Sequence, residues 1–413
     1  MSVDNKAPEI RFEGFSGEWI KNNLGELIDI RSAARVHKKQ WTEAGVPFFR
    51  TSDVVSIYKG QENTKVYISH EVYNDLSEKI GKVAKDDLLI TGGGSIGIPY
   101  LVPNDNPLYF KDADLLWLKN NKKFNGYFLY TFFFSECFKK HIKSISHTGT
   151  IAHYTIEQAK ATPINTCNDE EQTQIGNYFQ KLDALINQHQ QKHDKLNSIK
   201  KAMLEKMLPK QGETTPEIRF KGFSGEWEEK ELGTDIAEII GGGTPSTSIS
   251  EFWDGDIDWY SPTEIGDNVY AKGSQKKITA LGLKSCSAKI LPAGNTVLFT
   301  SRAGIGDMAI LAKPGSTNQG FQSLIVKEGF SPYFIYSAGK QIKDFALKHA
   351  SGSTFLEISG KQLGRMKILM PSLEEQTAIG NYFQNIDELI NQHQQQITKL
   401  NSIKQACLSK MFV

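Results

Sequence analysis

The sequence predicts an α+β protein in which two globular domains of mixed α/β structure are joined by two long antiparallel coiled-coil helices, with pseudo-twofold symmetry. Three observations predict it. Two sequence blocks recur after offsets of 208 and 204 residues, the block that ends each repeat has heptad spacing, and the segments between carry short strand-like runs. A length of 413 residues suggests about three domains, and the duplication reduces this number to two.

The repeat is strongest at its ends. The segment Pro8–Trp19 recurs as Pro216–Trp227 with eleven of twelve residues identical, and Glu171–Gln191 recurs as Glu375–Gln395 with seventeen of twenty-one identical. The intervening segments have diverged almost completely. Neutral drift would not leave the flanks untouched, so we infer that the flanks share one role and that the middle segments differ in theirs.

The second repeated block of each half has the pattern of a long helix. Asp169 is the expected N-cap of the first helix, and Pro209 and Gly212 are expected to end it. A helix of about 38 residues measures roughly 55 Å. The heptad a positions, which we expect to pack between the helices, are Ile175, Leu182, His189 and Leu196 in the first copy and Ile379, Ile386, His393 and Leu400 in the second.

The middle of each helix is polar, with the sequence NQHQQ in both copies. Polar residues at an a position fix the register of a coiled coil at a cost in stability. Two equivalent helices related by a pseudo-twofold axis pack antiparallel, which would place His189 and His393 near the crossing. Register setting is preferred over metal binding for these histidines, because no cysteine or carboxylate cluster accompanies them.

The middle segments show strand and turn signals. Strand-like runs occur at Asp87–Thr91 and Thr296–Thr300, and helix-like stretches follow near Tyr127–Lys143 and Tyr333–Lys348. The strand-following motifs TGGGSIG and TSRAGIG keep a threonine, an isoleucine and a glycine in common. The two middle segments are therefore expected to share a fold.

Composition sets limits on the class of protein. The chain has 48 Lys and Arg against 47 Asp and Glu, a net charge of +1, so no strong nonspecific attraction to nucleic acid is expected. Its four cysteines form no CxxC pair, the first residues contain no apolar signal region, and no apolar run approaches the roughly 20 residues of a membrane span. We expect a cytoplasmic protein without a membrane anchor.

Catalytic motifs are not recognisable in the sequence. The run at 92–97 matches GxGxxG, but the following IPYLVP is strand-like and a dinucleotide site needs a helix there. A tight glycine turn is the preferred interpretation. No phosphate-binding GxxxxGK[ST] loop, HExxH or GxSxG motif occurs. We expect no catalytic residues, no bound cofactor and no metal, and hence a binding protein.

Several motifs together resemble a known family. The segments PEIRFxGFSGEW, EEQxxIGNYFxxxDxLI and KLxxIKxAxLxKM are similar to the conserved regions of type I restriction–modification specificity (S) subunits. GGGTPST, Trp253–Ile265, Leu281–Gly294 and TSRAGIG in the second half resemble the target-recognition domains of that family. The first half departs from the pattern, because it lacks GGGTPS and has TGGGSIG in place of TSRAGIG.

The resemblance implies a non-catalytic DNA-sequence specificity subunit. In such a complex two modification subunits carry out N6-adenine methylation with S-adenosylmethionine, and two restriction subunits add ATP-dependent, Mg-dependent cleavage. Each recognition domain reads one half of a bipartite, non-palindromic site in double-stranded DNA. The helices set the gap and dock the modification subunits.

Base readout uses guanidinium groups, amides and small hydroxyl side chains in loops. On this basis we expect DNA contacts in the first domain from Arg31, Arg35, Arg50, Thr51, Ser52, Asp53, Ser95, Lys111, Thr148 and Thr150. In the second domain we expect them from Thr244, Ser246, Ser261, Thr263, Ser301, Arg302, Asn318, Gln319 and Ser353. For Asp53 a turn or helix cap is the favoured alternative, and for Arg302 a surface salt bridge is an equal one.

The expected domain organisation has four parts. Residues 1–167 form the first recognition domain, 168–212 the first spacer helix, 213–371 the second recognition domain and 372–413 the second spacer helix. Two other functions stay open: a coiled-coil adaptor whose middle segments bind proteins without reading DNA, and an enzyme with an unrecognised site.

Overall fold

The computed structural model describes residues 7–145, 153–266, 268–302, 304–352 and 356–413. The chain forms two compact units, Met1–His189 with Gln395–Val413 and Gln190–Gln394. Each unit therefore contains one globular domain together with part of both long helices, α7 (Asp169–Lys206) and α12 (Leu373–Lys410). The sequence reading assigned each helix as a separate segment after its domain, whereas the contacts divide both helices between the units.

Unit 1 is built on a four-stranded antiparallel sheet of order β2-β9-β6-β7, a second four-stranded sheet of order β3-β5-β4-β8, and the antiparallel pair β1-β10. Its strands are β1 (Ile20–Asn23), β2 (Asp29–Arg31), β3 (Trp41–Thr42), β4 (Val46–Phe49), β5 (Tyr67–Ile68), β6 (Leu88–Thr91), β7 (Pro99–Leu101), β8 (Tyr109–Phe110), β9 (Leu115–Lys119) and β10 (Pro163–Thr166). Its helices, besides the long ones, are α1 (Leu24–Leu27), η1 (Lys38–Gln40), α2 (Thr51–Lys59), α3 (His70–Ile80), α4 (Gly126–Phe132), α5 (Glu136–Ile145) and α6 (Ile156–Lys160).

Unit 2 repeats this plan with a five-stranded sheet of order β12-β19-β16-β17-β14, a three-stranded sheet β15-β13-β18 and the pair β11-β20. Its strands are β11 (Glu228–Glu231), β12 (Ala237–Gly241), β13 (Trp253–Tyr260), β14 (Tyr270–Ala271), β15 (Lys276–Ile278), β16 (Thr296–Phe299), β17 (Met308–Leu311), β18 (Gly315–Thr317), β19 (Gln322–Val326) and β20 (Lys367–Met370). Its shorter helices are η2 (Leu232–Ile236), η3 (Ser250–Phe252), η4 (Pro262–Glu264), α8 (Ala280–Lys284), α9 (Pro332–Ser337), α10 (Gly339–His349) and α11 (Gly360–Gly364).

The matching strand orders show that the two diverged segments share a fold, as predicted. The antiparallel order β2-β9-β6-β7 corresponds to β12-β19-β16-β17, and the parallel pair β4-β8 corresponds to β13-β18. The predicted strands are confirmed as β6 and β16. Each predicted helix-like stretch forms two helices instead of one; in unit 1, Ser135 starts α5 by accepting a hydrogen bond from the Phe138 amide at 3.3 Å.

The long helices are present as predicted, with one difference at the N-terminus. Asn168 is the residue that caps α7, since its side-chain oxygen accepts a hydrogen bond from the Glu171 amide at 2.8 Å, whereas Asp169 was expected. Helix α7 ends at Lys206, before Pro209. In unit 1 the start of α7 packs against the end of α12, with Phe179 and Leu182 in one core with Leu408 and Phe412, so the helices run antiparallel there.

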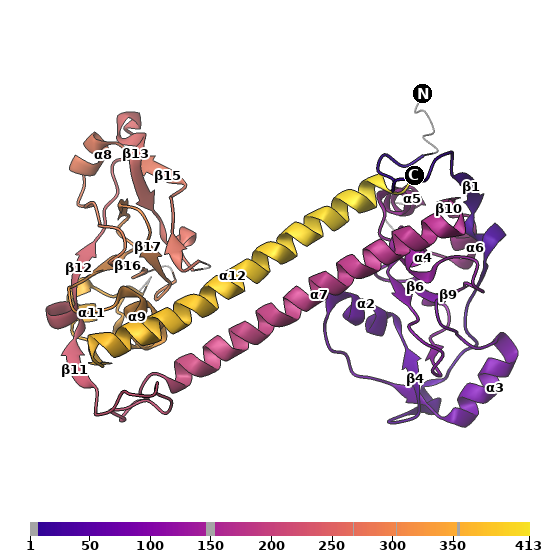
Figure 1. Cartoon of the computed structure of the whole chain (residues 1–413), viewed down its shortest axis with the longest axis horizontal. Helices are drawn as coiled ribbons and strands as arrows, with labels where there is room; N and C mark the ends of the chain where they lie inside the picture. The colour runs from indigo at the N-terminus through magenta and orange to yellow at the C-terminus, as the bar shows by residue number, and fades with distance from the viewer. Residues whose placement is uncertain (1–6, 146–152, 267, 303, 353–355) are drawn as a thin grey trace. The chain divides into compact units, whose positions relative to one another are not determined.

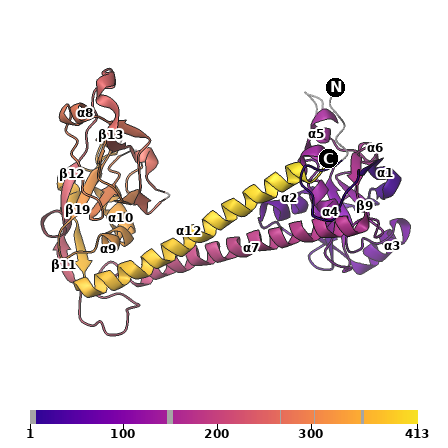
Figure 2. The ribbon, with the colours of Figure 1, turned by 45° about the horizontal axis from the view of Figure 1, so that its top comes forward.

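The duplicated N-terminal motif closes the end of this helix pair in each unit. In unit 1 the Ile10 amide donates to the carbonyl of Lys410, and Figure 1 and Figure 2 both show the first described residues beside the end of α12. In unit 2 the Ile218 amide donates to the carbonyl of Lys206 in the same way. The motif also carries Trp19 and Trp227, which are buried in the cores of their units. One conserved motif therefore ties the end of one helix to each domain.

Candidate nucleic-acid interface

The glycine run after β12 lets a loop approach the rest of unit 2 very closely. A Cβ atom at Gly242 would lie 2.0 Å from the carbonyl oxygen of Asn318, and one at Gly243 would lie 2.5 Å from Oγ of Ser287. Trp259 fixes the loop by donating from Nε1 to the Gly243 carbonyl at 2.9 Å. Only glycine fits such close backbone approaches, so this run positions the polar residues that follow it.

Most of the predicted contact residues of unit 2 come together on this loop and its neighbours. Thr244 donates a hydrogen bond to Oε1 of Gln319, and the Ser261 hydroxyl lies 3.1 Å from that of Thr263. The Asn318 amide donates to the Tyr260 carbonyl, which joins the two loops. Gln319, Thr263 and Ser246 are exposed, and Thr244, Ser261 and Asn318 are half-buried. The cluster presents hydroxyl and amide groups to solvent, the chemistry that base edges require.

Ser301 does not belong to this cluster. Its side chain is fully buried, and its hydroxyl has no hydrogen-bond partner among the described atoms. Strand pairing continues past β16, because the Ser301 amide donates to the Gly320 carbonyl and its own carbonyl accepts from Ile358. The expected DNA contact from Ser301 is thus corrected: the residue extends a buried strand instead of starting a loop. Arg302 is half-buried and forms a backbone bridge with Glu357.

Two of the predicted arginines of unit 1 are engaged within the protein. Arg50 donates from Nε to Oδ2 of Asp53 at 2.8 Å, and this bond raises the pKa of the Arg50 guanidinium. Asp53 also accepts from the Arg50 amide and from Asn63, so its carboxylate takes part in the cap of α2. The structure thus shows the helix cap that was the favoured alternative for Asp53, and a contact with DNA stays a prediction. Arg31 contacts Asp29 and lies over the Trp117 ring at 5.9 Å.

The other predicted residues of unit 1 are more dispersed. Thr51 donates to the Asp114 carbonyl at 3.3 Å, Lys111 pairs with Asp114, and Ser52 accepts from Asn63 at 3.1 Å. Arg35 and Ser95 are exposed. The predicted Thr148, Thr150 and Ser353 lie outside the described residues. The glycine run at 92–97 leads into strand β7 and not into a helix, in agreement with the preferred reading as a tight turn.

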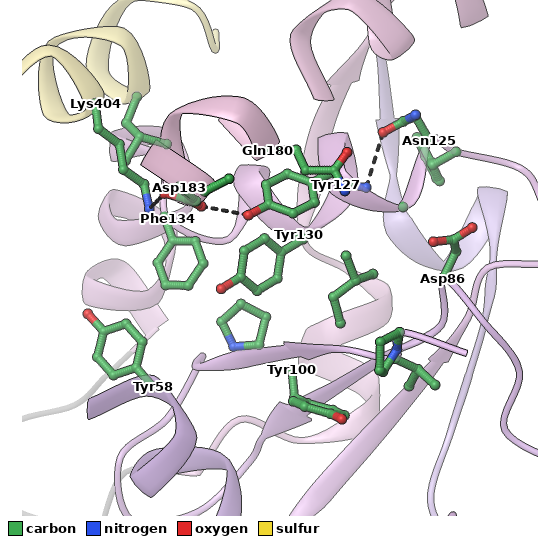
Figure 3. A pocket seen from close by; sticks show the side chains of 18 of the residues that line it. Tyr58, Asp86, Tyr100, Asn125, Tyr127, Tyr130, Phe134, Gln180, Asp183 and Lys404 are labelled. Atoms are coloured by element: carbon green, nitrogen blue, oxygen red, sulfur yellow. Dashed lines mark hydrogen bonds and ion pairs between the residues drawn. The ribbon is translucent and has the colours of Figure 1, made fainter. Parts of the chain in front are cut away.

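The structure shows a group of residues on the helices that sequence reasoning missed. In unit 1 the Asp183 carboxylate accepts from the Tyr127 hydroxyl at 2.7 Å and pairs with Lys404 of the other long helix at 2.6 Å (Figure 3). In unit 2, Asp387 does the same with Tyr333 at 2.7 Å and Lys200 at 2.5 Å. Burial and the neighbouring carboxylate raise the pKa of Tyr127 well above its usual range. Identity of all three residue types between the repeats was the signal that could have found this triad.

A second repeated contact is an arginine–glutamate pair. Arg11 binds Glu171 through Nε at 2.6 Å, and Arg219 binds Glu375 through Nε at 2.7 Å. Both glutamates are 1% exposed. Each pair joins the duplicated N-terminal motif to the first turn of a long helix. The triad and the pair together connect both long helices to the domain of each unit.

The predicted a positions divide between core and periphery. Ile175 and Leu182 are buried in unit 1, and Ile379 and Ile386 are buried in unit 2. The remaining a positions are half-buried: His189, Leu196, His393 and Leu400. The placement of the histidines at a helix crossing stays a prediction. Within the described ranges no three His, Cys, Asp or Glu side chains form a group that could hold a metal, and no helix there has the length and hydropathy to span a membrane.

Comparison with known proteins agrees with the duplicated architecture. Residues 16–198 and 224–402 each match the family model of the type I restriction modification DNA specificity domain. A specificity subunit of the restriction enzyme MjaIX of Methanocaldococcus jannaschii is 36% identical over 192 residues, which cover 46% of this chain and 44% of that protein. The chain thus matches less than half of the length of this relative.

Two further comparisons extend over almost the whole chain. The putative MjaX specificity subunit of the same organism is 26% identical over 399 residues, covering 90% of this chain and 88% of the relative. The crystal structure of the type I restriction–modification S subunit from M. genitalium has the same fold, with a TM-score of 0.66 at 16% identity, over 98% of this chain and 99% of that one. With two copies of the specificity domain that together span most of its length, the chain belongs to the family of type I restriction–modification specificity subunits.

Proposed function

We propose that this chain selects the DNA sequence for a type I restriction–modification complex and has no catalytic activity of its own. Each recognition domain reads one half of a bipartite, non-palindromic site in double-stranded DNA. The observation that carries the proposal is the contrast within the repeat. Both units keep the same strand order and the same helix contacts, yet the glycine-supported cluster around Thr244 and Gln319 has no equivalent sequence in unit 1.

The polar cluster of unit 2 has the chemistry for direct readout. An amide such as that of Asn318 or Gln319 can bind the N6 and N7 edge of adenine in the major groove, and hydroxyl groups can donate to or accept from several bases. One good base contact contributes about 1–3 kcal/mol of discrimination. A cluster of this kind supports recognition of a few base pairs by one domain.

The long helices are proposed to set the distance between the half-sites. Each has 38 residues, or about 57 Å of helix, which is enough to separate half-sites that lie about 34–36 Å apart on one face of DNA. Residues inserted within Asn187–Lys195 are expected to change the gap and leave the half-site bases unaltered. Altered half-site bases with an unchanged gap would contradict this role.

The partners follow from the family and from the repeat. The duplicated contacts of the helices offer two similar surfaces, which suits two copies of one modification subunit. In the proposed complex these subunits bind S-adenosylmethionine and methylate adenine at N6, and two restriction subunits supply ATP- and Mg-dependent cleavage. The near-neutral charge of +1 fits a reader whose partners contribute much of the affinity for phosphates.

The decisive experiment maps methyladenine in cells that express the modification subunits with this chain. A bipartite motif with a fixed gap is expected. The double variant Thr244→Ala/Gln319→Ala should reduce the base specificity of only one half-site. The control Thr42→Ala changes an exposed threonine of β3 that donates to the Ala44 carbonyl at 2.8 Å, and it should leave the motif intact. A palindromic or gapless motif would contradict two-domain reading. Equal affinity of the reconstituted complex for its motif and for scrambled DNA would favour the protein-binding adaptor.

A further inference from the structure

Unit 1 contains a large cleft that the proposed half-site reading does not use. It lies between α2, strand β7, helix α4 and the two long helices, and its volume is about 1360 Å³. Pockets for drug-sized ligands measure roughly 300–1,000 Å³. The cleft therefore has room for more than one group of the size of a nucleotide.

Aromatic rings from several elements form the walls of the cleft. Tyr58 of α2 stacks on Phe134 with ring centroids 5.8 Å apart and an angle of 12°, and Tyr130 meets Phe134 edge to face at 5.0 Å. Tyr100 of β7 also lines the cleft (Figure 3). Tyr58 is 55% exposed and the adjacent Ile57 is 51% exposed. Tyr100 and Tyr130 are half-buried. Aromatic faces that reach solvent bind bases by stacking, without sequence preference.

Lysines without acidic partners lie along the rim. Lys85, Lys122 and Lys123 line the cleft, and within the part of the chain that the structure describes none of them forms an ion pair. Lys404 differs from them, because Asp183 neutralises it. Asp86 and Asp169 also line the cleft, so the lysines exceed the carboxylates by a small number. A net positive lining beside aromatic walls favours an occupant that is both anionic and aromatic.

A hydrogen-bonded turn positions two of these lysines. The buried Asn120 side chain donates to the Phe124 carbonyl at 2.9 Å and accepts from the Phe124 amide at 2.9 Å, so it closes the turn on both sides. Asn121 and Lys122 adopt left-handed backbone conformations with φ of 48° and 61°. Residues other than glycine rarely adopt this conformation. The two hydrogen bonds of Asn120 therefore offset a backbone conformation that is unfavourable for Lys122.

The equivalent cleft of unit 2 has a different character. It measures about 630 Å³ and shares the floor of Tyr333 and Asp387, which correspond to Tyr127 and Asp183. Its other charged lining residues are Glu264, Glu388 and Lys272. Tyrosines line both clefts, including Tyr260 and Tyr270 in unit 2. Among the described lining residues, the excess of lysines is found in the cleft of unit 1. A partner that binds both units alike would not require this difference.

We propose that the cleft of unit 1 binds a short single-stranded stretch of nucleic acid. Its bases would stack on Tyr58, Tyr100 and Tyr130, and its phosphates would pair with the lysines of the rim. This activity is separate from duplex half-site reading and does not depend on it. The volume favours a strand over a single free nucleotide.

The test measures binding of a fluorescein-labelled 12-nucleotide oligothymidylate to the full-length chain by fluorescence anisotropy. Saturable binding is expected. Tyr58→Ser should weaken it about 5- to 100-fold, because loss of one stacked base has that effect, while Tyr58→Phe should retain the affinity. The double variant Lys122→Gln/Lys123→Gln should reduce the slope of log K against log salt by about 1.4, or about 0.7 for each phosphate contact with a single strand.

Matched variants of unit 2 provide the control. Tyr270→Ser and Lys272→Gln change the corresponding cleft and should leave the affinity unaltered, with thermal melts verifying that each variant is folded. Absence of saturable binding, or equal weakening by the unit 2 variants, would overturn the proposal. If free thymidine monophosphate bound equally tightly, the ligand would be a single nucleotide, and the proposal of a single strand would be overturned. Equally strong competition by polyglutamate would indicate an acidic protein segment instead. None of these outcomes bears on the methylation motif. A failure of the single-strand proposal can therefore be distinguished from a failure of the proposed function.

Discussion

Removal of the arginine from the buried ion pair of unit 2 should destabilise the junction between the duplicated motif and α12. Arg219 donates to Glu375 at 2.7 Å through Nε and again through Nη2, and it also donates to the carbonyls of Ser224 and Gly225. The variant Arg219→Met keeps most of the side-chain volume and removes all of these donors. Glu375, which is 1% exposed, then keeps a buried charge without its partner.

The expected loss follows from the burial of both side chains. Breaking a buried ion pair by removal of one partner costs about 3–5 kcal/mol, and the 17% exposure of the arginine favours a value near 3 kcal/mol. Unit 2 spans 205 residues, from Gln190 to Gln394. For a unit of this size 1 kcal/mol lowers Tm by about 2–4 °C, so the predicted loss is about 6–12 °C.

Thermal and urea unfolding of the full chain would measure this loss, with hydrogen exchange to locate it near 216–231 and 373–380. Lys221→Met, an exposed change in the same motif, should alter Tm by little, and Arg11→Met should produce the equivalent loss in unit 1. The double variant Arg219→Met/Glu375→Met should recover most of the stability, because no unpaired charge remains. A double variant whose loss equals the sum of the two single losses would refute the coupling of these side chains.

Three further predictions concern contacts of the helices. Gly176→Ala should cost about 1–3 kcal/mol, since its Cβ would lie 2.1 Å from Oδ1 of Asn125, whereas Gly380→Ala should be milder because its nearest atom is 3.2 Å away; equal unfolding midpoints of the two variants would contradict this. Burial, followed by nearby Asp183, raises the pKa of Tyr130 to about 12, so its contribution to stability is complete below pH 10 and is lost between about pH 10 and 12. The free energy of unfolding falls by at most about 1.4 kcal/mol per pH unit in this range. If Tyr130→Phe left the alkaline melting profile unchanged, ionisation of Tyr130 would not be the cause of this fall. Asp183→Asn removes the charge that Lys404 and Tyr127 share and should cost about 1–3 kcal/mol; stability indistinguishable from wild type in urea titrations would show that the triad does not couple the helices to the domain.

The regular elements were predictable because their signals are local. The heptads predicted both long helices, and the apolar runs at Asp87–Thr91 and Thr296–Thr300 predicted two central strands that the structure confirms as β6 and β16. The N-cap was misassigned by one residue, from Asn168 to Asp169, because both residue types cap helices and only the geometry distinguishes them.

The candidate site was less predictable, because the role of each side chain depends on contacts with residues that are distant in the sequence. Asp53 caps α2 and binds Asn63, and Ser301 is buried by pairing with Gly320. Neither partner is visible in a local motif. Thr244 and Gln319 were predicted as DNA contacts one by one, and their hydrogen bond joins residues that lie 75 positions apart in the chain.

The sequence by itself determined the duplication, the helical flanks, the shared fold of the diverged segments and the family, because these depend on repeats and periodicities that are written along the chain. Only the tertiary structure decided that both helices are divided between the two units, which polar side chains face solvent, and that several lysines and tyrosines line one cleft of unit 1. The physical reason is that burial and ion pairing depend on contacts between residues far apart in sequence. The burial of Glu375, for example, depends on its ion pair with Arg219, which lies 156 residues away in the chain.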